Sequence, residues 1–250
     1  MNYFRTENTA QFISVIRTLV IAVFCLLIGT ERIMAQQSTI IGAAAVYEVP
    51  IGSLHERFLG TAGAMVFAGA EVSSKLTWVG KIQYSEFSSV NSDALNKSVT
   101  VGQGIGAQKV VLPLPKLTMD LKTTSVMAEA QLSLLRSEFA DVNGIAGFGF
   151  TNWVNTRGAY YDSLFVKNAV SGLPEKVAAL AVPAIRQEDW SGTVNLGIEL
   201  TGAIIGPVWF TVGADYKLIV GELWQTLDLD LENVAGMQFV SIRAGVKAKL

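Results

Sequence analysis

Apolar and polar residues alternate with a period of two over long stretches of the chain. In the segment VSIRAGVKAKL, one parity is aliphatic from Val240 to Leu250, and the other carries Arg243, Lys247 and Lys249. A period of two places successive side chains on opposite faces, which indicates a β-strand with one apolar and one polar face. The same alternation predicts strands at residues 76–87, 124–135, 191–203, 208–219 and 239–250.

Three further segments, 41–49, 61–71 and 143–154, are rich in glycine and alanine and complete a set of eight predicted strands. Glycines on one parity, such as Gly147 and Gly149, fit a curved sheet with a tight interior. Short links alternate with four long ones, at about 50–60, 88–123, 155–190 and 220–238. This rhythm is typical of membrane barrels with tight periplasmic turns and long extracellular loops. We predict an all-β fold: an eight-stranded antiparallel up-and-down transmembrane β-barrel.

The first 35 residues have the features of a cleaved signal peptide. Arg5 and Arg17 precede the apolar run Thr18–Gly29, and Ala35 follows as a small residue at the expected cleavage point. The run is shorter than the ~20 residues of a membrane-spanning helix. Its Cys25 is preceded by Phe24 rather than by the small residue of a lipoprotein signal. We expect export through the Sec pathway and a barrel domain at 36–250 that has no cysteine.

Charged residues make up 16% of the chain, against ~25% in ordinary soluble domains, and the mean hydropathy is +0.40. No segment after residue 35 has 18 consecutive apolar residues, so this apolarity is spread over the strands. The polar face of each predicted strand carries about one charged residue, and both signs occur. A face exposed to water would hold more charged residues. We expect these charges to neutralise one another in a narrow lumen: Glu48, Glu71, Lys81, Glu129, Glu199, Asp215, Lys217, Arg243 and Lys247.

A soluble, lipocalin-like barrel also has eight alternating strands, with the apolar face inward. The sparse charge of the polar parity favours lipid outside and a side-chain-filled lumen inside. Aromatic residues near the predicted strand ends weakly support interfacial girdles: Tyr47, Trp78, Tyr84, Trp153, Trp190 and Tyr216.

With these features the chain resembles the small OmpA/OmpX-type outer-membrane β-barrel family. The matching segments are the signal peptide, YEVPIG at Tyr47–Gly52, GAMVFAGAEV, KLTWVGKIQYSEF and VSIRAGVKAKL. The resemblance implies residence in a Gram-negative outer membrane and assembly by the barrel-assembly machinery through the C-terminal strand. Family members usually end on an aromatic residue, whereas Leu250 stands here, and no peptidoglycan-binding domain is expected after the last strand.

Catalytic chemistry has few candidates in the sequence. The single histidine, His55, has Ser53 and Glu56 as neighbours, but neighbours in a loop are not a constructed triad. We therefore predict no enzyme, no catalytic residue, no metal site and no cofactor, and we keep a lipid A-modifying enzyme as the last alternative.

The long loops hold the candidate interaction surface. Residues 160–185 are unusually apolar for an exposed loop, which marks a partner surface or a cap over the barrel mouth. The candidate surface residues are Tyr160, Tyr161, Leu164, Phe165, Leu173 and Leu180. Pro174 is a candidate first residue of a short helix, PEKVAALAV. The loop at 88–123 is expected to extend its hairpin, and Asp228, Asp230 and Glu232 are expected to form a solvated face.

The predicted role is structural, interaction-based or adhesive, exerted through the loops of a monomer. The expected partners are outer-membrane lipid, the barrel-assembly machinery and an unidentified extracellular partner, without nucleic acid. The alternatives, in order, are a narrow channel or porin, a soluble lipocalin-like ligand carrier and the lipid A-modifying enzyme.

Overall fold

The computed structural model of the chain describes residues 38–101, 108–114, 117–167, 171–224 and 233–250. Residues 39–250 form one compact unit, while the predicted signal peptide lies outside the described residues. No helix among the described residues is long and apolar enough to span a membrane.

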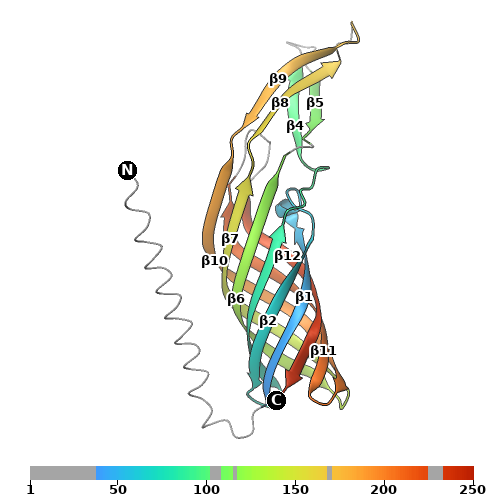
Figure 1. The fold of residues 1–250 in the computed structure, drawn as a ribbon, viewed down its shortest axis with the longest axis vertical. Coiled ribbons are helices and arrows are strands. Elements are labelled where there is room, and N and C mark those ends of the chain that lie inside the picture. The colour runs from blue at the N-terminus through green and yellow to red at the C-terminus, as the bar shows by residue number, and fades with distance from the viewer. Residues whose placement is uncertain (1–37, 102–107, 115–116, 168–170, 225–232) are drawn as a thin grey trace, which may run out of the picture. The chain divides into compact units, whose positions relative to one another are not determined.

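Eight antiparallel strands close into a barrel in the order β1-β12-β11-β10-β7-β6-β3-β2 (Figure 1). The strands are β1 (Thr39–Ile51), β2 (Thr61–Glu71), β3 (Leu76–Phe87), β6 (Met119–Arg136), β7 (Ala140–Arg157), β10 (Ile185–Ile205), β11 (Val208–Leu223) and β12 (Val234–Lys249). Each strand pairs with its neighbours along the chain, apart from the inserted hairpins, and β1 pairs with β12 to close the ring. The prediction of an eight-stranded up-and-down barrel is confirmed.

Three tight turns, β2–β3, β6–β7 and β10–β11, define the short-turn end of the barrel. The Ser73 and Ser137 side chains accept hydrogen bonds from the backbone N–H groups of Leu76 (3.2 Å) and Ala140 (3.0 Å). Gly206 in the β10–β11 turn has φ +54°, a left-handed conformation that glycine adopts without the strain of a side chain. Serine side chains in two of the links and a glycine in the third therefore help to reverse the chain at this end.

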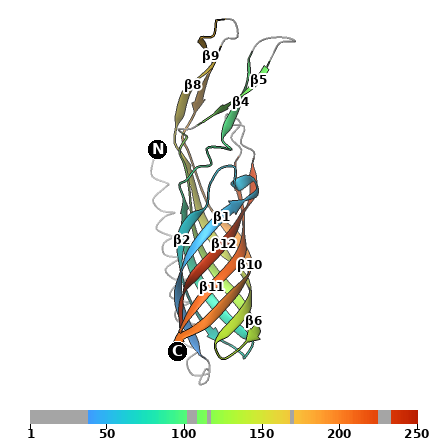
Figure 2. The ribbon, with the colours of Figure 1, turned by 90° about the vertical axis from the view of Figure 1, so that its right-hand side faces the viewer.

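The opposite, long-loop end holds a short 3-10 helix, η1 (Gly52–Leu54), and two hairpins outside the barrel sheet (Figures 1 and 2). One hairpin pairs β4 (Asn96–Val101) with β5 (Gln108–Pro113), and the other pairs β8 (Tyr160–Lys167) with β9 (Pro174–Val182). The loop at 88–123 thus forms a hairpin as expected, but in a sheet of its own.

The helix predicted from Pro174 is wrong, because PEKVAALAV forms strand β9. Proline is tolerated as the first residue of a strand, and Pro174 pairs there with Lys167 of β8. Partner hydrogen bonds along β8 outweigh the helix preference of alanine, leucine and lysine, since tertiary context overrides propensity.

Candidate functional site

Most strands of the barrel turn their apolar parity outward and their polar parity inward. On β1, β2 and the start of β3 several inward positions are apolar as well, and six of them form a buried cluster: Ile40, Ala44, Val46, Met65, Phe67 and Val79. Large aliphatic and aromatic side chains cover the outer surface while charged side chains are buried in the lumen. On β10 the outward residues Leu196 and Ile198 are 63% and 60% exposed, whereas the inward Glu199 is 3% exposed. This arrangement is the reverse of that in a water-soluble barrel.

Eight buried charges form the lumen charge network. Its members are Glu48, Lys81, Glu129, Glu199, Asp215, Lys217, Arg243 and Lys247, four acids and four bases. Because an unpaired buried charge is costly, such a set requires mutual pairing. The equal numbers of the two signs meet that requirement.

Arg243 of β12 is the hub of this network. Its guanidinium lies 3.0 Å from Glu199, 3.5 Å from Asp215 and 3.8 Å from Glu129. Lys81 pairs with Glu129, and Lys247 lies 3.1 Å from Glu199. Charges from β3, β6, β10, β11 and β12 are thereby connected across the lumen.

Glycine makes room for this hub. A Cβ at Gly147 would lie 2.2 Å from the Asn195 Oδ1, and one at Gly213 would lie 2.8 Å from the Arg243 Nε. Asn195 in turn donates to the Glu129 Oε1 at 2.6 Å. These two glycines give the large polar side chains space inside a small barrel.

Lys217 and Glu48 form a second pair nearer the long-loop end. The Ser241 hydroxyl donates to the Glu48 Oε1 at 3.1 Å. The Lys217 ammonium also lies 5.0 Å from the centre of the Phe239 ring, within range of a cation–π interaction. A hydroxyl ladder crosses the neighbouring wall, from Ser125 to Thr151 (2.8 Å) and on to Thr193 (2.6 Å).

Glu71, the ninth predicted lumen charge, lies instead at the short-turn end in the rim ring. This ring consists of Glu71, Arg136, Asp141 and Lys249, which alternate in sign. Arg136 lies 3.3 Å from Glu71 and 3.7 Å from Asp141, and Lys249 lies 3.1 Å from Asp141 and 3.8 Å from Glu71. The sequence analysis does not identify Arg136 and Asp141 as lumen or rim charges, because both fall in the short link between the strands predicted at 124–135 and 143–154.

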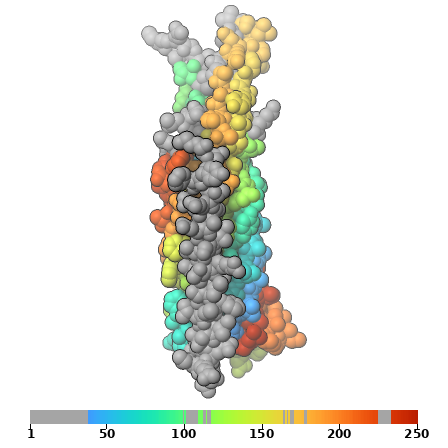
Figure 3. Space-filling view, turned by 60° about the vertical axis from the view of Figure 1, so that its left-hand side comes forward, coloured from blue at the N-terminus to red at the C-terminus, as the bar shows by residue number. Residues whose placement is uncertain are grey.

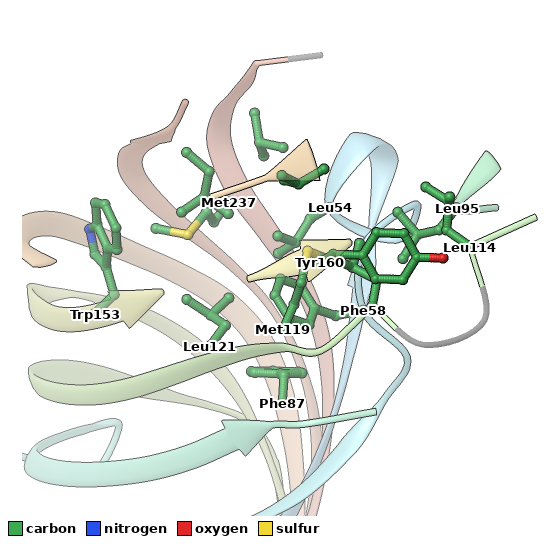
Figure 4. Close-up of a cluster of buried hydrophobic side chains, with 14 of the residues drawn as sticks. Leu54, Phe58, Phe87, Leu95, Leu114, Met119, Leu121, Trp153, Tyr160 and Met237 are labelled. Atoms are coloured by element: carbon green, nitrogen blue, oxygen red, sulfur yellow. The ribbon is translucent and has the colours of Figure 1, made fainter. Parts of the chain in front are cut away.

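An apolar cap fills the long-loop end of the lumen (Figure 4). It combines residues of the strand ends, the loops and the bases of the hairpins. Its members are Leu54, Phe58, Phe87, Leu95, Leu114, Leu117, Met119, Leu121, Trp153, Tyr160, Leu180, Val182, Ile219, Leu223, Val234, Met237 and Phe239. At about 1.5–3 kcal/mol for each large side chain removed from water, this cluster stabilises the loops substantially.

Three residues predicted to be exposed or interfacial are part of this cap. Tyr160 is 4% exposed and Leu180 9%, so neither is available to a partner, and Trp153 points inward at 3% exposure. Burial, together with a hydrogen bond to the Asp162 carboxylate (2.8 Å), raises the pKa of Tyr160 to about 12. The remaining predicted aromatics, among them Trp78 and Trp190, face outward.

The exposed part of the candidate surface lies on the β8–β9 hairpin. Tyr161 is 75% exposed, Leu173 68% and Phe165 53%. The structure does not describe the side chain of Leu164. The predicted solvated face with Asp228, Asp230 and Glu232 falls in residues 225–232, outside the described residues. In Figure 3 the hairpin atoms, yellow to orange, lie at the end of the barrel away from the short turns.

His55 is exposed in the loop after η1, and its backbone carbonyl accepts a hydrogen bond from the Asn91 side chain at 2.8 Å. Ser53 and Glu56 are exposed beside it. Within the described ranges no group of three or more His, Cys, Asp or Glu side chains could hold a metal ion.

No protein-family model matches the chain, and no curated protein is significantly similar to it in sequence. Similar solved structures include Neisserial surface protein A, at 13% identity and a TM-score of 0.48, covering 85% of this chain and 97% of that one. A major outer membrane protein of Thermus thermophilus has 10% identity and a TM-score of 0.45 over 86% and 99% of the two chains. The attachment invasion locus protein of Yersinia pestis has 12% identity and a TM-score of 0.39 over 86% and 97%. Because these TM-scores lie below 0.5, the functional assignment rests on the chain's own surface.

Proposed function

We propose that this chain is an integral β-barrel protein of a Gram-negative outer membrane, with a closed lumen and an interaction role exerted through its loops. The observation that carries the membrane assignment is the inside-out barrel, aliphatic outside and ion-paired inside. In water such a surface would expose far more contiguous apolar area than soluble monomers tolerate. A closed barrel satisfies every ladder hydrogen bond internally, as a lipid environment requires.

The orientation argues against a soluble ligand carrier. A lipocalin-like barrel needs an apolar interior to receive its ligand. Here the middle of the lumen holds the charge network and the long-loop end holds the apolar cap.

Cell fractionation tests the membrane assignment. The protein is expected with outer membranes, and its migration on gels should change on heating, since intact barrels resist unfolding by detergent. Recovery in the soluble periplasmic fraction would contradict the proposal.

A closed lumen is favoured over a channel because side chains occupy two successive layers. An eight-stranded barrel has an interior just wide enough for its side chains. Arg243 and Lys217 are each 1% exposed, and the cap covers the layer that they occupy. Planar-bilayer recordings of purified protein at high salt should show no reproducible conductance steps, and regular steps would revive the channel alternative.

The loop role rests on the β8–β9 hairpin, which exposes large apolar side chains without packing them on the barrel. Replacing residues 161–179 with a short Gly–Ser linker, which keeps Tyr160, Leu180 and Val182 in the cap, should reduce attachment of expressing cells to the surfaces that they bind. A separate deletion, of residues 97–112, removes the β4–β5 hairpin and measures the share of that hairpin. Unchanged attachment after both changes would leave a purely structural role.

The lipid A-modifying enzyme remains a weaker alternative because His55, Ser53 and Glu56 are all exposed. A His55→Ala strain with unchanged lipid A mass spectra is the expected result.

A further inference from the structure

The register of the β8–β9 hairpin separates its charges by face. Paired residues in an antiparallel ladder project to the same side, and successive pairs alternate. Tyr161 pairs with Ala181, Phe165 with Lys176, and Lys167 with Pro174. The register shifts between Leu164 and Phe165, where β9 carries one extra residue. The uninterrupted alternation of β8 places Tyr161, Phe165 and Lys167 on one face, with Lys176 paired to Phe165. We call this face the cationic–aromatic face.

The acids lie on the opposite face. Asp162 pairs with Leu180, and Glu175 pairs with Val166. Near its base that face packs on the cap through Tyr160, whose hydroxyl donates to the Asp162 carboxylate. The two hairpin acids are thus turned away from Lys167 and Lys176, which are both exposed.

The second hairpin adds cations of the same sign. Lys97 of β4 and Lys109 of β5 lie in a stretch of sequence that has no acidic residue between Asp93 and Asp120. Neighbouring like charges raise the local concentration of counter-ions and steer ligands of opposite sign. The hairpins therefore present a field suited to an extended anion.

Resting on the proposed loop role, we infer that the cationic–aromatic face binds an acidic polysaccharide, one that carries sulfate or carboxylate groups. Lys167 and Lys176 neutralise these groups, and the exposed rings of Tyr161 and Phe165 pack against the apolar faces of sugar rings. The two aromatic residues are four positions apart on β8, about 13 Å along the strand. That separation suits a chain of several linked sugars rather than a single small anion.

The cations of both hairpins are lysines, and the described residues there include no arginine. Lysine presents a compact point charge rather than the bidentate fork of arginine, so it neutralises sulfate or carboxylate groups without fixing their orientation. A face that runs the length of the hairpin fits an extended polymer that lies along it.

The test compares dextran sulfate, carboxymethyl-dextran and neutral dextran of equal length, with the full-length protein in zwitterionic nanodiscs. The sulfated and carboxylated polymers should bind, more weakly as salt rises, and neutral dextran should not. Lys167→Gln with Lys176→Gln should weaken binding about tenfold and flatten the salt dependence. Tyr161→Ala with Phe165→Ala should weaken polymer binding while leaving the salt dependence unchanged.

Glu175→Gln is the matched control, because it changes one charge on the opposite face of the same hairpin. Its binding should equal or exceed that of the original protein. Heat-dependent gel migration confirms that each variant is folded. Equal binding of neutral dextran, tighter binding of single-stranded DNA, or no effect of the lysine pair would overturn the inference. If replacing residues 161–179 lowers attachment while no dextran binds, the loop role stands and the ligand class is wrong.

Discussion

The lumen charge network and the apolar cap fill successive parts of one barrel with opposite chemistry. In the network, charged side chains point inward and aliphatic side chains point outward. In the cap, apolar side chains point inward, while Lys122 and Glu188 point outward as exposed side chains. On several strands both regions use inward positions, so the boundary between them is an inversion of polarity along the strand. Strand β10 is an exception, because its inward Ser191 and Gln187 stay polar toward the long-loop end.

Strand β6 shows the inversion within a few residues. Its inward positions change from Ser125 and Thr123 to Leu121 and Met119 as the strand approaches the long-loop end. On β12, Arg243 and Ser241 give way to Phe239 and Met237 in the same direction. The strands thus behave as membrane strands on one side of the boundary and as strands of a water-soluble core on the other. On β7 the inversion is incomplete, because Asn155 is buried beyond Trp153.

Removing the hub of the network should have the largest effect. Arg243→Met leaves three carboxylates without their shared cation, and breaking a buried pair costs about 3–5 kcal/mol. Urea titration of folding in detergent micelles should show this loss of stability. A loss in the free energy of unfolding below about 1 kcal/mol would contradict this, and would mean that water solvates the three carboxylates or that they bind protons in place of the guanidinium.

A cavity in the cap should cost somewhat less. Leu121→Ala removes a fully buried side chain, and such substitutions cost about 2–5 kcal/mol. We expect the loss to appear first as faster proteolysis of the long loops, because the cap joins them to the barrel. The control is Leu196→Ala on the outer face, which should leave loop proteolysis unchanged.

The Glu48–Lys217 pair allows an ion pair and apolar side chains to be compared at the same two positions of the lumen. Glu48→Leu and Lys217→Met should each destabilise the protein by several kcal/mol, since each leaves the partner charge buried and alone. The double variant should recover most of the loss, because apolar replacements of both partners are often near neutral. A strictly additive double-mutant cycle would show that the pair is not coupled.

The smallest effect is expected at the rim. Lys249→Gln removes a partly exposed partner from the rim ring, and such pairs contribute less than about 1 kcal/mol. High salt should erase the difference from the original protein. A larger loss in the free energy of unfolding that persists at high salt would mean that the rim ring behaves like the buried charge network.

The inversion explains how much of the fold the sequence could predict. The sequence predicts all eight barrel strands, five from aliphatic and polar alternation and three from glycine- and alanine-rich segments between the recurring links. Six strands extend beyond their predicted long-loop ends: β1 ends at 51 instead of 49, β6 begins at 119 instead of 124, β7 ends at 157 instead of 154, β10 begins at 185 instead of 191, β11 ends at 223 instead of 219 and β12 begins at 234 instead of 239. The pattern used to find them reverses at about those positions.

The hairpins and the cap were harder to foresee for a related reason. Strands β8 and β9 have no consistent division into an apolar and a polar face. One face packs on the cap at the base of the hairpin, and both faces are exposed to solvent farther out. Tyr160 and Tyr161 are identical neighbours in sequence, yet one is buried and the other is the most exposed tyrosine of the hairpin. Which of the two is buried depends on which face of β8 packs on the cap. The cap is formed by residues far apart in the chain, so the local sequence does not reveal that face.

The rim ring has a consequence for the correctness of strand pairing. If β12 slipped by two residues against its neighbours, its apolar face would still point outward, because side-chain direction repeats every two residues. The same slip would move Lys249 by about 7 Å, beyond reach of Asp141 and Glu71. The alternation of apolar and polar residues does not distinguish the native register of β12 from one shifted by two residues. The four charges of the rim ring do distinguish them, because only the native register lets all four pair.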